Sequence, residues 1–345
     1  MTRHINIPIF IPHLGCPNMC VFCNQRTISG VQKFDFSSVR KTIDDNLSSV
    51  TSTDEVEIAF FGGSFTGIDR DLMISLLEIA YGYIKEGKVC SVRCSTRPDY
   101  INAEILEILK KYGVKTVELG LQSTDPEVLK LTKRGHGFSE EKEASRLLVE
   151  NGFDLVGQMM IGLPGSSLES ELETAEFIIN SGAKAARIYP TVVFSETELC
   201  DMAKEGSYSP LSIDEAVERS AAVLEKLVSS SVDVIRIGLC SSENLLSDKT
   251  YFAGPNHPAL GELVENELYY KRIMNKLSEF QIADKCDMEI FVSVGALSKA
   301  VGQKRKNKIR LQNDPRVRSV RFSERHGIGP YEIDLQIENG DKRCI

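Results

Sequence analysis

Two patterns of apolar residues follow one another along most of the chain. Short runs rich in Val, Ile and Phe predict β-strands, and between them apolar residues recur at the three- and four-residue spacing of amphipathic helices. The predicted strands are 5–11, 55–61, 89–94, 114–121, 153–161, 185–189 and 232–237. The predicted helices are 37–50, 69–85, 101–111, 140–150, 168–180 and 216–228. This regular alternation of strand and helix predicts a parallel α/β fold.

The loops that follow the predicted strands carry the unusual residues. A dinucleotide-binding fold would place Gly-x-Gly-x-x-Gly after its first strand, but cysteines stand there instead. In a βα barrel the carboxyl ends of all strands open on one face, where active sites are built. We therefore predict a partial (β/α)6 TIM-type barrel in which residues 16, 63, 97, 122, 158 and 189 converge on one mouth.

The last part of the chain has a different pattern. A strand at 288–294, helices at 296–301 and 307–312, and a strand at 317–322 form a small α+β arrangement around Gly302-Gln303-Lys304-Arg305. This order resembles a minimal KH module, in which a Gly-x-x-Gly turn clamps a nucleic-acid backbone. Arg305 replaces the second glycine. We predict two domains, 1–275 and 276–345.

Composition and charge limit the classes of protein. The 345 residues are 42% hydrophobic and 26% charged, with a formal net charge of −8, as in many soluble globular proteins. No secretory signal or apolar run of about 18 residues is present, so we expect no membrane contact. Nine cysteines without a regular framework argue against a secreted disulfide scaffold, and we expect a reducing cytoplasm.

Positive charge gathers near the C-terminal turn. Residues 304–321 hold eight Lys or Arg and one acidic residue, Asp314, a local charge of +7 on a chain of −8. This asymmetry favours contact with a polyanion, and we predict that RNA binds at 302–321. A solvated basic face on a small appendage is the alternative.

Three cysteines, Cys16, Cys20 and Cys23, lie within eight residues directly after the first predicted strand. Three thiolates on one loop can hold three irons of a cubane cluster and leave the fourth iron open to a ligand. Zinc is the alternative metal, with His13 as a possible fourth ligand. Three buried thiols without a metal are a further alternative.

The remaining candidate residues stand at other strand ends. Gly62-Gly63 removes side chains where a ligand lies close to backbone N–H groups, although a plain tight turn has the same pattern. Arg97 can clamp a carboxylate, and Gln122 at a strand end is a candidate ligand-binding residue. Residues 133–136 form a compact cationic turn.

These residues together carry a family resemblance. The Cys-x-x-x-Cys-x-x-Cys loop, with Phe22 before the last cysteine, resembles the radical S-adenosylmethionine (radical SAM) superfamily. Over about residues 1–275, several stretches resemble the radical domain of the Elongator catalytic subunit. They are 95–99 (STRPD), 118–123 (ELGLQS), 133–136 (KRGH), 158–165 (QMMIGLPG), 188–191 (IYPT), 196–199 (ETEL) and 254–258 (GPNHP).

The resemblance implies a [4Fe–4S] cluster on Cys16, Cys20 and Cys23 and S-adenosyl-L-methionine (AdoMet) on its open iron. It implies reductive cleavage of AdoMet to a 5′-deoxyadenosyl radical, with flavodoxin or ferredoxin as the reductant. By position, it places Gly63 and Ser64 at the methionyl amino group. The full set of implied AdoMet contacts is Gly62, Gly63, Ser64, Thr96, Arg97, Gln122, Arg134 and Gln158. Tyr189 is our candidate catalytic residue.

Three departures from the family pattern alter the expected activity. Ser95 stands where relatives often have a glutamate, which removes one AdoMet contact. The spacing of the first two cysteines is closer to that of oxygen-independent coproporphyrinogen oxidase. The chain ends without the acetyltransferase domain of the Elongator subunit, so we do not expect acetyl-CoA-dependent carboxymethylation of uridine.

Three functional hypotheses follow from the sequence. The first is a radical SAM enzyme that modifies RNA, a tRNA base in particular. The second is a radical SAM enzyme that acts on a small molecule such as a tetrapyrrole. The third is a non-enzymatic RNA-binding protein with a structural cluster, which predicts no cleavage of AdoMet.

Overall fold

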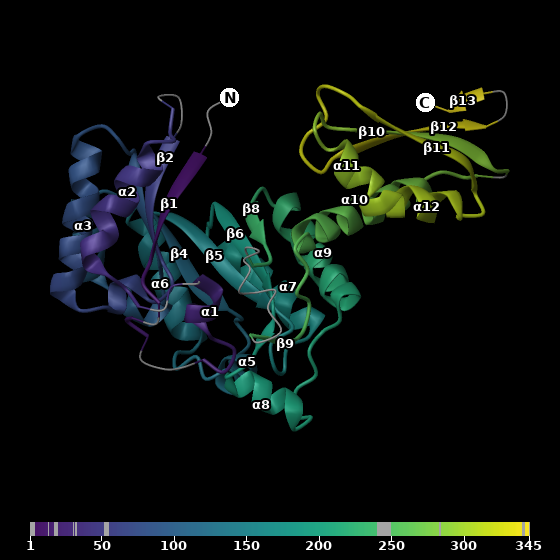
Figure 1. The fold of residues 1–345 in the computed structure, drawn as a ribbon. Helices are drawn as coiled ribbons and strands as arrows, with labels where there is room; N and C mark the ends of the chain where they lie inside the picture. The colour runs from purple at the N-terminus through teal and green to yellow at the C-terminus, as the bar shows by residue number, and fades with distance from the viewer. Residues whose placement is uncertain are drawn as a thin grey trace. The chain divides into compact units, whose positions relative to one another are not determined.

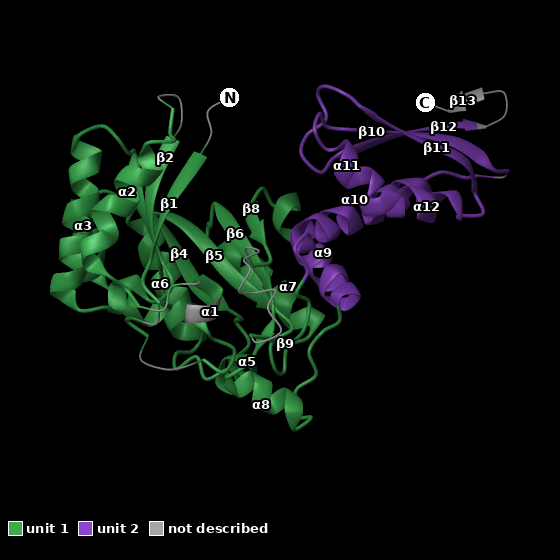
Figure 2. Cartoon of the chain, viewed as in Figure 1, with its two compact units in different colours: residues 1–212, 226–256 green, residues 213–225, 257–345 purple. Residues whose placement is uncertain are grey.

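The structure is a computed structural model that describes residues 4–12, 14–16, 20–29, 31, 33–51, 55–239, 250–282, 284–339 and 342–344. It divides into two compact units, one of residues 1–212 and 226–256 and the other of residues 213–225 and 257–345 (Figure 2). Their boundary differs from the predicted one at 275/276, because helix α10 (Leu260–Ser278) packs in the core of the second unit.

The first unit is built on a seven-stranded sheet whose strands follow the chain order, β1-β2-β3-β4-β5-β6-β8 (Figure 1). All neighbouring strands pair in parallel. The strands are β1 (His4–Phe10), β2 (Glu55–Phe61), β3 (Ser91–Thr96), β4 (Val114–Gln122), β5 (Asp154–Ile161), β6 (Ala185–Pro190) and β8 (Asp233–Ile237). This sheet confirms the predicted partial (β/α) barrel.

Helices connect successive strands, as right-handed βα units require. They are α2 (Val39–Leu47), α3 (Arg70–Lys85), α4 (Ala103–Lys111), α6 (Phe138–Glu150), α7 (Leu168–Asn180) and α9 (Ile213–Ser229). Local sequence fixes their starts: the side chains of Asp69 and Asn102 accept hydrogen bonds from backbone N–H groups three residues on, at 3.0 and 3.1 Å.

Several short elements were absent from the sequence prediction. They are α1 (Gln25–Ser29), α5 (Pro126–Leu131), α8 (Glu198–Lys204), the antiparallel pair β7 (Val193–Phe194) and β9 (Tyr251–Ala253), and the 3-10 turns at Phe36–Ser38, Phe65–Gly67 and Pro98–Tyr100. The last two turns follow β2 and β3 directly. They position the loops that carry the candidate site residues.

The two faces of the barrel sheet differ in chemistry. Apolar residues such as Ile58, Val117 and Ile188 are fully buried in the core. Charged residues at alternate strand positions, Glu57 and Glu118 among them, are equally buried. Because side chains alternate between faces along a strand, these charges share the face opposite the apolar core. The inner face of the half-barrel is therefore polar.

The second unit contains the predicted strand–helix–turn–helix–strand order. Its elements are residues 213–225 of α9, α10, β10 (Cys286–Val292), α11 (Leu297–Val301), the 3-10 turn Gln303–Arg305, α12 (Lys306–Gln312), β11 (Val317–Glu324), β12 (Ile333–Asn339) and β13 (Lys342–Cys344). The sheet order is β11-β10-β12-β13, with β10 parallel to β11 and antiparallel to β12. Ile273, Leu277, Ile290 and Leu311 are completely buried between this sheet and the helices. No helix of the described chain is long and apolar enough to span a membrane.

Candidate active site

The cysteine loop follows β1 and leads into α1. Cys20 is buried and its carbonyl accepts a hydrogen bond from the Cys23 N–H at 2.9 Å. Burial, followed by the neighbouring Cys20 thiol, raises the pKa of Cys16; burial and the two neighbouring thiols raise the pKa of Cys23 to about 12. The described side chains contain no preformed group of three His, Cys, Asp or Glu that holds a metal ion, so the ligand set stays a prediction.

The glycine turn after β2 packs against the backbone of this loop. The Ser64 N–H donates to the Leu14 carbonyl at 3.2 Å. A Cβ added to Gly63 would lie 2.4 Å from the same oxygen, and one added to Gly15 would lie 2.1 Å from the Ser64 carbonyl. These contacts are far closer than atoms can approach, so glycine is required where the two backbones cross. The backbone that lies close to Gly63 is that of the cysteine loop, and the approach of a ligand to Gly62-Gly63 stays a prediction.

Hydroxyl groups continue from the glycine turn to the end of β3. Ser64 Oγ lies 3.0 Å from Thr96 Oγ1, and Thr66 Oγ1 lies 2.6 Å from the same atom. The Arg97 N–H donates to Ser64 Oγ at 3.2 Å. Ser64 and Thr96, from two different strand ends, are therefore in direct contact.

Two buried arginines lie at the cysteine loop. Arg134 Nη1 donates to Cys20 Sγ at 3.2 Å, and its Nη2 donates to the Gly120 carbonyl. Arg97 makes a bidentate ion pair with Asp99 at 2.9 and 3.0 Å and also donates to the Arg134 carbonyl. Arg97 does clamp a carboxylate, but it is that of Asp99. The positive charges of Arg97 and Arg134 partly offset the rise that burial causes in the pKa of Cys16.

The turn that carries Arg134 is less cationic than its sequence indicates. Lys133 points outward to Glu198 at 2.6 Å. His136 Nδ1 lies 3.6 Å from a carboxylate oxygen of Glu141, and both side chains are completely buried. Burial lowers the pKa of His136 to about 4 and raises the pKa of Glu141 to about 9. Both groups are therefore neutral at pH 7, and Arg134 supplies the inward-facing charge.

Gln122 stands in a strained backbone position at the end of β4. Its φ of 72° lies in the left-handed region, and the pairing of β4 with β5 shifts register between Gly120 and Gln122. A Cβ added at Gly120 would lie 3.0 Å from Gln122 Nε2 and 3.6 Å from Arg134 Nη2. Gln122 and Arg134 thus flank Gly120 together.

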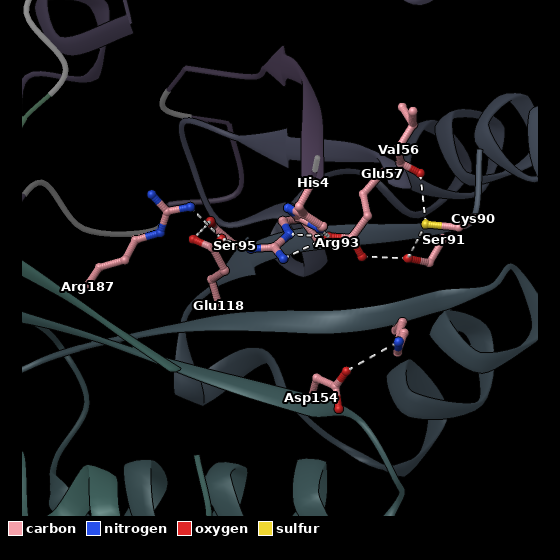
Figure 3. Close-up of polar contacts among 11 residues, drawn as sticks. His4, Val56, Glu57, Cys90, Ser91, Arg93, Ser95, Glu118, Asp154 and Arg187 are labelled. Atoms are coloured by element: carbon pink, nitrogen blue, oxygen red, sulfur yellow. Dashed lines mark hydrogen bonds and ion pairs between the residues drawn. The ribbon is translucent and has the colours of Figure 1, made fainter. Parts of the chain in front are cut away.

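A separate polar network covers the inner face of the barrel (Figure 3). Glu118 accepts from Arg93 Nη1 at 2.9 Å, Arg187 Nη2 at 2.8 Å and Gln158 Nε2 at 2.8 Å. Glu57 accepts from Arg93 at 2.7 and 2.9 Å. His4 Nε2 lies 2.8 Å from Glu57, and Ser91 donates to it. Two carboxylates thus face two guanidinium groups, which balances the buried charge.

Gln158 and Tyr189 belong to this network. Gln158 also lies 3.4 Å from Ser95 Oγ. Tyr189 Oη accepts from Arg187 Nη1 at 3.5 Å, and burial raises the pKa of Tyr189. No described hydrogen bond joins Gln158 or Tyr189 to the cysteine loop, so their contacts with AdoMet and substrate stay predictions.

Sequence reasoning did not predict roles for Glu57, Arg93 and Arg187. A signal was present, because each is a charged residue with an apolar residue on either side of it within a strand. Their partners lie on other strands, 25 to 69 residues away in sequence, so only the barrel closure reveals the network.

Comparisons with known proteins identify a family that matches this chain. Residues 10–178 match the model of the radical SAM superfamily, and residues 183–270 match that of the radical SAM C-terminal domain. With these two matches the chain belongs to the radical SAM superfamily.

Individual relatives show which members of the superfamily this chain is similar to. The chain is 31% identical to tRNA uridine(34) acetyltransferase of Methanocaldococcus infernus, over 48% of this chain and 35% of that protein. It is 28% identical to Elongator complex protein 3 of Homo sapiens, over 62% of this chain and 46% of that protein. It therefore spans less than half the length of these curated relatives. The solved Elp3 of M. infernus superposes with a TM-score of 0.63 at 24% identity, covering 80% of this chain and 64% of that one, which shows the fold.

Membership implies a [4Fe–4S] cluster and AdoMet, and the residues present fit both. Thiolates bound to iron carry negative charge, and the Arg134 guanidinium donates to one of the three sulfurs. Arg134 Nε is buried and has no hydrogen-bond partner among the described residues, which leaves a donor for a further ligand. Cys16, Cys20 and Cys23 would hold the cluster.

Proposed function

We propose that this chain is a radical SAM enzyme that modifies a tRNA base. The observation that carries the proposal is the contact of buried Arg134 with Cys20, in a chain whose relatives include proteins named for tRNA uridine 34. Tetrapyrrole chemistry is not favoured by these relatives. We propose that, after AdoMet cleavage, the enzyme acts on the base as a transferase or an oxidoreductase.

The cluster would supply the electron that cleaves AdoMet to methionine and a 5′-deoxyadenosyl radical, with flavodoxin or ferredoxin as the external reductant. Arg134 holds the Cys20 sulfur by a charge-assisted hydrogen bond. Gly63 and Ser64 hold the backbone of the cysteine loop against the end of β2.

The polar inner face of the barrel suits a polar substrate. Ser64, Thr96 and Gln122 offer hydroxyl and amide groups at the strand ends, where we propose they bind AdoMet. Arg187 and Tyr189 present donors that we propose orient the substrate base, and we propose that Gln158 beside them contacts AdoMet. Their positions are fixed by Glu118, because it accepts a hydrogen bond from both Arg187 and Gln158.

The test is anaerobic reconstitution with iron and sulfide, followed by measurement of 5′-deoxyadenosine with and without bulk tRNA. We expect AdoMet cleavage that increases several-fold with tRNA. Cys20→Ala should abolish it, whereas Cys90→Ala, which removes an exposed thiol outside the loop, should not. Absence of 5′-deoxyadenosine would support the non-enzymatic hypothesis. Cleavage that tRNA leaves unchanged would contradict the proposed substrate.

A further inference from the structure

The second unit contains a groove that the proposed chemistry does not use. It encloses about 320 Å³ between α11, α12 and strand β11. Apolar side chains of Leu297, Val301 and Phe322 contribute to its lining, together with the cationic side chains of Arg305, Lys308 and Arg321. An apolar surface bordered by positive charge is typical of sites that bind a ligand with both a flat apolar part and an anionic part.

The unpaired positive charge of this region is concentrated at the groove. Of the eight Lys and Arg residues in 304–321, four pair with carboxylates: Lys306 with Asp214, Arg310 with Glu267, Arg316 with Asp314 and Arg318 with Asp287. The other four are Lys304, Arg305, Lys308 and Arg321. The described part of the chain gives none of these four an acidic partner within 4.0 Å. Three of them line the groove, and the fourth is next to Arg305.

The turn that carries Lys304 and Arg305 is held in a strained conformation. Lys304 and Arg305 have φ values of 52° and 63°, in the left-handed region that side chains other than glycine seldom adopt. Buried Asn266 accepts from the Gln303 N–H at 2.8 Å, and buried Asn307 donates to the Asn266 carbonyl at 2.7 Å. Strain of this kind persists where the surrounding structure enforces it, frequently at binding sites.

The other wall of the groove is β11, which is an edge strand of the described sheet. Edge strands leave half of their backbone N–H and C=O groups unpaired. Val320, Arg321 and Phe322 of this strand line the groove. The strand thus adds hydrogen-bonding backbone groups to the apolar and cationic side chains, which together match the edges, faces and phosphates of nucleotides.

We propose that this groove binds a short single-stranded segment of RNA. Phosphates would lie against Lys304, Arg305, Lys308 and Arg321, and bases would lie over Phe322 and its apolar neighbours. A duplex hides its base faces within the stack and cannot use the apolar lining, so a single strand fits better. This inference deepens the proposed function by stating where the chain holds RNA. That the RNA is tRNA rests on the proposed function.

The test is fluorescence anisotropy of the full chain with a labelled single-stranded RNA 12-mer at low salt. Lys308→Gln with Arg321→Gln should weaken binding at least about tenfold, since two phosphate contacts are lost. Lys285→Gln with Arg318→Gln removes the same charge from the same unit outside the groove and should change it less than about twofold. An equal effect of both pairs, no binding of the 12-mer, or displacement by poly-glutamate as effective as by RNA would overturn the inference.

Cleavage of AdoMet without RNA separates this inference from the proposed function. Both variant pairs lie outside the proposed catalytic machinery and should leave that basal cleavage unchanged. Loss of 12-mer binding in the groove pair alone, in a chain that tRNA never stimulates, would support the groove and contradict the proposed function. Stimulation of AdoMet cleavage by tRNA, with equal 12-mer binding in both variant pairs, would support the proposed function and contradict the groove.

Discussion

At Gly63 the position that a side chain would occupy is filled by the carbonyl of Leu14, 2.4 Å from an ideal Cβ. Gly63→Ala must therefore displace the loop that carries Cys16. We predict that this variant, purified anaerobically after reconstitution, holds several-fold less iron than the parent protein. Gly82→Ala is the matched control, because no atom lies within 4 Å of its added Cβ and alanine favours a helix interior by roughly 0.5–1 kcal/mol. Equal iron content in both variants would contradict this role of Gly63.

Glu141 is buried without a hydrogen-bond partner among the described residues, and burial raises its pKa to about 9. The folded chain then holds a proton on Glu141 that the unfolded chain releases near pH 4.5. The contribution of Glu141 to stability should consequently fall as pH rises from about 4.5 to about 9. Glu141→Gln should remove this dependence and raise the free energy of unfolding by about 1–3 kcal/mol at pH 8. Urea titrations at pH 5 and pH 8 measure it; a variant less stable than the parent at pH 8 would show that Glu141 is needed as an anion.

At the scale of secondary-structure elements, ion pairs between side chains connect the strands of the half-barrel in addition to their backbone hydrogen bonds. Glu118 on β4 accepts from Arg93 on β3 and Arg187 on β6. Glu118→Ala leaves both cations buried without this partner, which should lower the free energy of unfolding by about 3–5 kcal/mol. Glu143→Ala, which removes an exposed carboxylate paired with Arg146, should have little effect. Chemical denaturation compares the two, and similar losses would contradict the importance of the network.

The elements that sequence predicted well are those with one dominant pattern. The run 55–61 is apolar except for Glu55 and Glu57, and polar residues and glycines border it; the structure has a strand at these residues. Helix 168–180 was predicted with its observed bounds, and in the structure the Ser167 side chain caps its first turn. Helix α10 was not predicted, although Leu260, Val264 and Leu268 have helical spacing, and β12 was not predicted despite its alternating Ile333, Leu335 and Ile337.

The candidate site was predictable only in part, for a physical reason. Residues at strand ends can be listed from sequence, and the contact of Ser64 with Thr96 follows from the barrel. The partner of each residue depends on three-dimensional closure: Arg97 pairs with nearby Asp99, and Gln158 pairs with Glu118, forty residues earlier. Sequence predicted the location of the site better than its internal contacts.

At the scale of the whole molecule, the chain is acidic but carries a local charge of +7 in 304–321. The proposed binding of RNA must therefore depend on a few unpaired cations and not on the net charge. We predict that the logarithm of the tRNA association constant falls linearly with the logarithm of salt concentration. The slope should be about −3, as expected for four cations at about 0.7–0.9 ions released each. Filter binding between 50 and 300 mM salt measures it; a slope near zero would contradict electrostatic binding.

The central claim is that Cys16, Cys20 and Cys23 hold a cluster with one open iron. Electron paramagnetic resonance of the reconstituted and reduced full chain, with and without AdoMet, tests it most directly. We predict a signal of a reduced [4Fe–4S] cluster that changes on addition of AdoMet, with Cys20→Ala losing the signal and Cys90→Ala retaining it. A chain that binds zinc in place of iron, or a cluster signal that AdoMet leaves unaltered, would contradict the account.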